Sequence, residues 1–138
     1  MPFYKKEHLK AKDYEMIYLP ILQTYLNDDT IKNIPDTFGK FDFKGENKFI
    51  EMKQRNINST TYKDTMMPLN KINYCLQHPD IDFYFVILFN DGLFIWKYDV
   101  NATLNYRVGG RNDRLQNEMK DYCYIPITIL EKVCQKMI

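Results

Sequence analysis

The chain has few of the residues that would point to a metal-thiolate, secreted or membrane protein. Its 138 residues include three cysteines, two histidines and five glycines, and the formal net charge is only +1. The cysteines are widely spaced and form no CxxC pair, which argues against a zinc knuckle and favours reduced thiols inside a cell. Because the net charge is near zero, any affinity for nucleic acid must come from where the basic residues lie.

Segments that direct a chain to or through a membrane are also missing. Charged residues occur throughout the N-terminal region, so no signal peptide is expected. The longest apolar run, residues 83–89, is far too short to span a bilayer. No Walker A sequence, GxSxG elbow or glycine-rich phosphate loop occurs. We therefore expect a soluble, intracellular protein, cytoplasmic or associated with the nucleoid or nucleus, with no membrane partner.

What is present is the composition of one globular domain. Apolar residues make up 45% of the chain and aromatic residues 15%. At this length, such a composition can bury one core but not two. No linker, repeat or low-complexity stretch divides the sequence, so we expect a single domain over residues 1–138.

The hydrophobic periodicity predicts helices on either side of a run of strands. Helical spacing covers residues 5–26, where Pro20 predicts a kink or two abutting helices. N-cap candidates before a second helical segment predict a helix over 59–77, and a closing helix is expected over 126–137. The segments expected to be strands are 31–35, a hairpin within 38–55, 81–90, 93–98 (after a turn at Asp91 and Gly92) and 122–125. This order predicts an α/β or α+β fold with helices flanking a mixed sheet.

The hairpin within residues 38–55 has one apolar and one charged face. With a turn centred between Gly45 and Glu46, Phe41 lies opposite Ile50. Side chains alternate along a strand, so Phe43 is expected on the same face as Phe41. A slip of one residue would expose this apolar set, and burial of the phenylalanines therefore selects the register.

In that register the opposite face gathers Asp42, Glu51 and Lys53. Two carboxylates can hold Mg²⁺, which prefers oxygen ligands and keeps several waters. A bound cation acidifies its water and offsets charge on a phosphate, and a nearby ammonium stabilises the same charge. The pattern acid-x-Lys occurs four times in the chain, and each occurrence taken alone also fits a solvated face. A metal-dependent phosphodiesterase and an ordinary charged strand therefore both remain open at this point.

This arrangement resembles the PD-(D/E)xK nuclease superfamily over roughly residues 7–98. Members share an αβββαβ core in which an aspartate and the (D/E)xK tripeptide occupy adjacent strands of a hairpin. The resemblance implies a restriction-endonuclease-like fold and Mg²⁺- or Mn²⁺-dependent hydrolysis of DNA. Relatives include Holliday-junction resolvases, so a structure-selective, junction-resolving endonuclease is one expected form, and a homodimer would let it cut two strands.

The resemblance also implies roles for individual residues. Asp42, Glu51 and the main-chain carbonyl of Met52 would be metal ligands, and Lys53 would be the catalytic lysine. The literal Pro-Asp pair of the superfamily name also occurs and ends at Asp36, which is therefore an alternative to Asp42.

Further candidates lie outside the tripeptide. Many relatives add an acid from the first helix, for which Glu15 is the first candidate and Glu7 the second. A glutamine follows the lysine in some relatives, the predicted second helix would cross behind the site, and residues 107–114 combine glycines with guanidinium groups suited to phosphate. Solvated or salt-bridged surface positions are the alternative for each of these. The residues expected to contact DNA are Gln54, Arg55, Lys63, Lys71, Arg107, Arg111 and Arg114.

A second hypothesis belongs to another functional class. The chain could be a catalytically inactive nuclease-like module that binds DNA or assembles with other proteins. Degenerate members of the superfamily usually lose the lysine or an acid. Because the acids and the lysine are all present here, the enzyme is the favoured hypothesis.

Overall fold

The computed structural model describes residues 10–35, 40–109 and 120–137; for residues 106–109, 120 and 121 it describes the backbone alone. Within those ranges the helices are α1 (Ala11–Tyr25), α2 (Leu69–Gln77) and a short 3₁₀ helix, η3 (Ile127–Ile129). The strands are β1 (Lys32–Asn33), β2 (Phe43–Gly45), β3 (Lys48–Gln54), β4 (Asp64–Pro68), β5 (Asp82–Phe89), β6 (Gly92–Lys97), β7 (Asn105–Gly109), β8 (Lys120–Pro126) and β9 (Glu131–Cys134).

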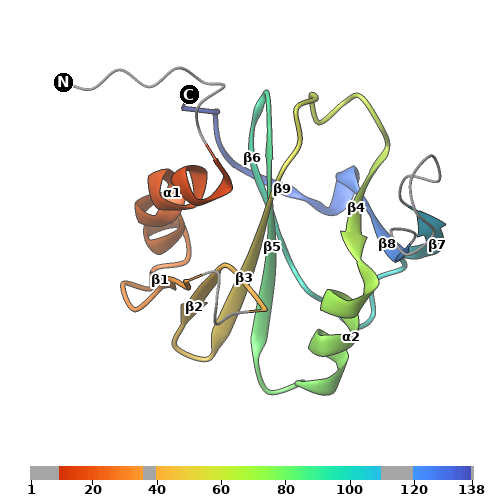
Figure 1. The fold of residues 1–138 in the computed structure, drawn as a ribbon, viewed down its shortest axis with the longest axis horizontal. Helices are drawn as coiled ribbons and strands as arrows, with labels where there is room; N and C mark the ends of the chain where they lie inside the picture. Colours follow the sequence, from red (N-terminus) through yellow and green to blue (C-terminus); the bar gives the residue numbers. More distant parts are fainter. Residues whose placement is uncertain (1–9, 36–39, 110–119, 138) are drawn as a thin grey trace.

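The strands form a large mixed sheet and a small antiparallel one. The six-stranded sheet has the order β1-β2-β3-β5-β6-β9, in which β3 and β5 are parallel and the other neighbours antiparallel. The three-stranded sheet has the order β4-β8-β7. Helix α1 covers one face of the large sheet, while α2 and the small sheet lie on the other side (Figure 1). With β4 set aside in the small sheet, α1 to β5 follow the order αβββαβ, which confirms the predicted fold class.

Strand β5 contributes side chains to two hydrophobic cores, one on each face of the large sheet. Val86 and Leu88 pack with α1, whereas Phe83 and Phe85 pack with α2 and the small sheet. A strand between two cores must be apolar at both its even and odd positions. The nearly continuous aromatic and β-branched run therefore predicted the central strand correctly.

The predicted register of the first hairpin is wrong. Phe43 pairs with Ile50, and the turn is formed by Glu46 and Asn47, whose φ of 55° lies in the left-handed region. Asparagine tolerates this conformation better than most residues, so it can occupy a turn position that glycine often takes. Gly45 is needed for another reason: a Cβ there would lie 2.9 Å from the side chain of Ile31.

Phe41 and Phe43 also lie on opposite faces of the sheet, contrary to the prediction. Phe43 belongs to the core beneath α1, whereas Phe41 packs in the core beneath α2. Phe41 precedes the first residue of β2 and lies in a bend, where the strict alternation of a strand does not apply. Because both faces of this sheet are covered, two phenylalanines can be buried without sharing a face.

The helix predicted over residues 59–77 is a strand followed by a shorter helix. Thr65 and Met67 are buried with the two-residue period of β4, which pairs with β8, and α2 begins only after Pro68. Proline disfavours the helical conformation in the residue before it, so a helix can follow Pro68 more easily than it can pass through it. Lys63 therefore precedes a strand and is not on the helix.

Smaller differences concern α1, the second hairpin and the C-terminal segment. Helix α1 is one helix that contains Pro20. The turn before β6 is formed by Asn90 and Asp91, one position earlier than predicted, and Gly92 is the first residue of the strand. The predicted closing helix is instead η3 followed by β9, which pairs with β6 and covers its open edge. The other predicted strands, near residues 31–35, 81–90, 93–98 and 122–125, are confirmed as β1, β5, β6 and β8.

Candidate active site

The candidate site lies where β2 begins, beside the part of β3 that extends past its pairing with β2. Asp42 directly precedes β2, and its backbone N–H donates to the Ile50 carbonyl at 3.0 Å. The Asp42 side chain continues the pairing in place of the strand, because Oδ2 accepts a hydrogen bond from the Met52 N–H at 2.8 Å. The first motif acid is thus held against β3 by one main-chain and one side-chain bond.

Glu51 is the buried acid of the site. Its side chain is only 5% exposed, and its two oxygens face two ammonium groups: Lys53 Nζ is 3.3 Å from Oε2 and Lys71 Nζ is 3.6 Å from Oε1. The pKa of Glu51 is raised to about 7, first by burial and then by the charge of Asp42, while the two lysines oppose the shift. Because Asp42 Oδ2 binds the N–H of Met52, the residue next to Glu51, the two predicted metal ligands lie on neighbouring parts of the hairpin.

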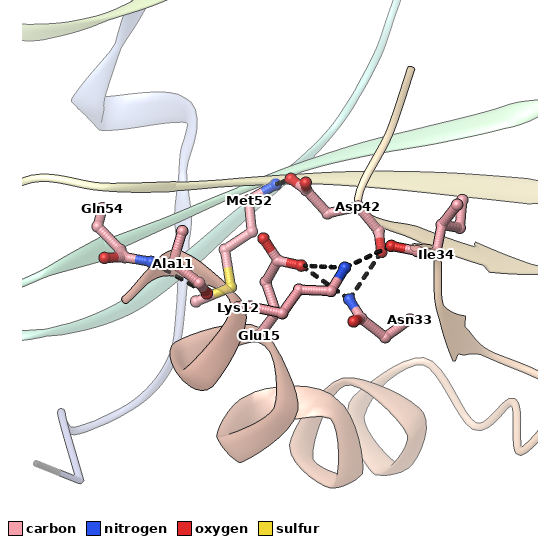
Figure 2. A network of polar contacts seen from close by, with 8 residues as sticks. All are labelled: Ala11, Lys12, Glu15, Asn33, Ile34, Asp42, Met52 and Gln54. Atoms are coloured by element: carbon pink, nitrogen blue, oxygen red, sulfur yellow. Dashed lines mark hydrogen bonds and ion pairs between the residues drawn. The ribbon is translucent and has the colours of Figure 1, made fainter. Parts of the chain in front are cut away.

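Glu15 reaches the same region from helix α1. Its Oε1 accepts hydrogen bonds from Asn33 Nδ2 at 2.8 Å and from Lys12 Nζ at 3.4 Å (Figure 2). Asn33 Nδ2 also donates to the main-chain carbonyl of Asp42 at 2.9 Å, so one amide joins the helix acid to the hairpin acid. Burial raises the pKa of Glu15, and the charge of Asp42 adds to that effect. Lys12 further binds the carbonyl of Ile34.

The candidate metal ligands are two carboxylates and one main-chain carbonyl, a set of oxygen donors that suits a hard divalent cation. In residues 10–35, 40–109 and 120–137, no group of three His, Cys, Asp or Glu side chains is arranged to hold a metal. The N–H and C=O of a strand residue point to the same side. Because the Met52 N–H faces Asp42, the Met52 carbonyl faces that side too, past the pair formed by Ile50 and Phe43, the first residue of β2. Mg²⁺ needs only one or two carboxylates when waters and a phosphate complete its shell.

Two of the predicted DNA-contacting residues follow the tripeptide directly. Gln54 and Arg55 line a cavity of about 350 Å³, and Gln54 Nε2 lies 3.5 Å from the carbonyl of Ala11. The guanidinium of Arg55 donates to the carbonyls of Gln54 and Met66, at 3.3 and 3.0 Å. Burial lowers the pKa of Arg55. These contacts tie β3 to β4, a structural role that sequence reasoning did not identify.

The remaining predicted positions either lie away from the tripeptide, contact Glu51, or have no described side chain. Lys63 is exposed, ahead of β4, and Lys71 lies in the first turn of α2 against Glu51. Arg107 belongs to β7, where only the backbone is described. Four of the candidate positions lie outside the described residues, namely Arg111, Arg114, Glu7 and Asp36.

Sequence reasoning missed two partners of the acids. It placed Lys71 on a helix predicted to touch DNA, and it did not find the contact with Glu51. Pro68 could have revealed the contact, because it fixes where the short helix begins. The start of the helix in turn decides which of its side chains face the sheet. No local pattern singled out Asn33, because its role depends on α1 and the hairpin meeting beside β1.

The fold and the site together define a class of protein. A mixed sheet in αβββαβ order, with an aspartate beside one strand of a hairpin and Glu-x-Lys on the next, is the arrangement of the PD-(D/E)xK nuclease superfamily. Within it, the chain belongs to the family described as "phage putative PDDEXK endonuclease", which matches residues 37–133, more than two thirds of the chain. The matched span contains Asp42, Glu51, Lys53 and Lys71 and begins after Glu15. Searches of curated proteins and of solved structures give no match.

Proposed function

We propose that this protein is a Mg²⁺- or Mn²⁺-dependent DNA endonuclease that hydrolyses phosphodiester bonds. The observation that carries the proposal is the convergence of Asp42, Glu51 and Lys53 on the part of β3 that lies beside the start of β2. Membership of a family described as an endonuclease supports the same reaction class. No helix in the described part of the chain is long and apolar enough to cross a bilayer.

In the proposed reaction Asp42, Glu51 and the Met52 carbonyl hold the cation. Bound there, Mg²⁺ would acidify a coordinated water and offset negative charge on the phosphate. The Met52 N–H keeps one oxygen of Asp42 in place, which leaves Oδ1 as the oxygen for coordination. Glu51 must be ionised to coordinate, and its raised pKa makes coordination increasingly favourable as pH rises through about 7.

In this proposal Lys53 supplies a positive charge to the reacting phosphate. Its ammonium lies 3.3 Å from Glu51 Oε2 and belongs to the same strand, so it would lie beside any phosphate bound at the Glu51 carboxylate. There it would stabilise charge that develops on the phosphate oxygens and help to orient the attacking water. Glu15, through Asn33, holds the main chain of Asp42 and adds a third negative charge to the region.

The proposed substrate is DNA, read by shape. A domain of this size offers little surface for sequence-specific contacts, which favours a structure-selective activity such as junction resolution. Gln54, Arg55, Lys63, Lys71 and Arg107, together with Arg111 and Arg114, remain the proposed DNA contacts. A homodimer would place two sites on opposite strands. A panel of branched, nicked and linear DNA, with size-exclusion chromatography of the protein, tests these finer points.

The decisive experiment is nicking of supercoiled plasmid with Mg²⁺ or Mn²⁺. We expect the wild type to nick, and Glu51→Ala and Lys53→Ala each to lower the rate by on the order of a hundredfold or more. Glu46→Ala is the control, because Glu46 is an exposed residue in the turn of the same hairpin. Nicking that survives both active-site substitutions would show that the activity comes from another site or another protein.

One observation favours the alternative of an inactive nuclease-like module. No ready cluster of three metal-binding side chains exists in the residues that the structure describes, and Glu15 is engaged by Lys12 and Asn33. Such a module would bind DNA or a protein partner without cleaving. Wild-type protein that binds DNA in a gel-shift assay but shows neither cation binding nor nicking would establish this alternative.

A further inference from the structure

Glu51 is bracketed by two ammonium groups that come from different elements. Lys53 belongs to β3 itself, whereas Lys71 reaches the other oxygen from the first turn of α2. The Lys71 side chain is 18% exposed and the Glu51 side chain 5%. Withdrawing an ammonium from water is unfavourable unless it is paired, so this position of Lys71 requires a compensating partner. The proposed catalytic lysine therefore has a neighbour of the same charge at the same carboxylate.

The position of Lys71 is set by an aromatic cluster. Its Nζ lies 4.9 Å from the ring centroid of Phe41, a cation–π distance. The Phe41 ring in turn packs against Tyr74 of α2 at 5.6 Å and against Phe83 of β5 at 5.3 Å between centroids. The same packing holds α2 on the sheet, so the helix is held with Lys71 directed at Glu51.

A second lysine pair in the chain shows what an ordinary surface contact looks like. Lys97 Nζ lies 3.6 Å from Asp82 Oδ1, the same distance as in the pair of Lys71 with Glu51. Its side chains are 56% and 46% exposed, so water screens the pair. The two pairs are matched in length and differ in burial and in their distance from the motif.

We propose that Lys71 is a second active-site lysine. In the metal-free protein its ammonium offsets the charge of Glu51 at Oε1, one of the two oxygens that a divalent cation would use. Cation and ammonium repel each other, so binding at Glu51 displaces Lys71, whose flexible stem can carry the charge to a non-bridging oxygen of the scissile phosphate. This inference rests on the proposed function. It adds that the cation must displace the Lys71 ammonium from Glu51 before cleavage.

The first test measures Mn²⁺ binding to the DNA-free protein at pH 8 by electron paramagnetic resonance. Lys71→Met keeps an apolar stem on Phe41 and removes the charge. Without the competing ammonium, we expect this variant to bind Mn²⁺ roughly fivefold more tightly than the wild type. Lys97→Met is the matched control and should bind as the wild type does. A residue with a merely structural role would not tighten cation binding when replaced.

The second test measures plasmid nicking at saturating Mn²⁺. Here Lys71→Met should be slower than wild type by roughly ten- to a hundredfold, because one charge opposite the phosphate is missing. Lys71→Arg restores that charge and should recover part of the rate. Tighter cation binding together with slower cleavage is the result that supports the inference.

Three other results would overturn it. If Lys71→Met matches Lys97→Met in both assays, the pair with Glu51 is a structural contact without a role in the reaction. If Lys71→Met and Lys71→Arg both weaken Mn²⁺ binding with unchanged thermal unfolding, Lys71 positions Glu51 and does not compete with the cation. If the wild type binds no Mn²⁺ and does not nick, the proposed function fails, and this inference fails with it.

Discussion

The burial of Glu51 predicts an unusual pH dependence of stability in the metal-free protein. Its pKa is raised from the ordinary 4.5 to about 7, chiefly because the side chain is withdrawn from water. The folded protein therefore holds this proton more tightly than the unfolded chain does. Between pH 4.5 and 7 folding takes up the proton, so the free energy of unfolding falls as pH rises through this window.

The magnitude follows from the same shift. One pKa unit corresponds to about 1.4 kcal/mol, so ionised Glu51 costs roughly 3 kcal/mol of stability at pH 8 relative to pH 4. Glu51→Gln keeps a neutral side chain of the same shape at every pH. We expect it to match the wild type near pH 4.5 and to exceed it at pH 8 by up to roughly 3 kcal/mol.

Urea unfolding in EDTA at pH 4.5, 6 and 8 measures this difference. Subtracting the two curves removes the titration of all other groups to first order, and Glu46→Gln controls for loss of an exposed carboxylate. Adding Mn²⁺ at pH 8 should stabilise the wild type and leave Glu51→Gln nearly unchanged, since a ligand that binds only the folded state raises its stability. Parallel pH curves for wild type and Glu51→Gln would refute the reasoning.

Two further predictions concern residues that hold the site in shape. Asn33→Ala removes the amide that joins Glu15 to the Asp42 carbonyl, so we expect a loss of about 1–3 kcal/mol in urea unfolding and nicking at least several-fold slower. Asn33→Asp should be worse, because it adds a fourth acid beside Glu15, Asp42 and Glu51. Gly45→Ala brings a Cβ within 2.9 Å of neighbouring atoms and should lower the free energy of unfolding by about 1–3 kcal/mol. Asn47→Gly, at a φ of 55°, should leave it nearly unchanged. Equal losses of stability at the two positions would contradict the assigned turn.

Some parts of the site were predictable from short stretches of sequence. Glu51 and Lys53 are two residues apart in a strand, so the pleat alone places them on one face whatever the strand pairs with. The apolar run of β5 requires cover on both sides wherever it lies in a sheet. The fold class followed from the order of such segments. Local geometry is enough for these predictions because the side-chain period of a strand does not depend on distant contacts.

Other parts depended on how distant segments meet. The predicted register failed because either Gly45 or Asn47 could have formed the turn, and the contact of Gly45 with Ile31 was invisible in the hairpin itself. Phe41 left the face of Phe43 because a second core exists beneath α2. Nevertheless Asp42 still reaches β3, because its own side chain binds the Met52 N–H.

Sequence by itself thus determined which acid and which lysine share a strand face. Tertiary structure decided what surrounds them: Asn33 joining the helix acid to Asp42, and Lys71 brought over Glu51 by the packing of α2. The physical reason is that a strand's alternation is a property of its own backbone. Burial, charge pairing and the pKa of Glu51 instead arise from side chains on separate elements, which are brought together only when the two cores form.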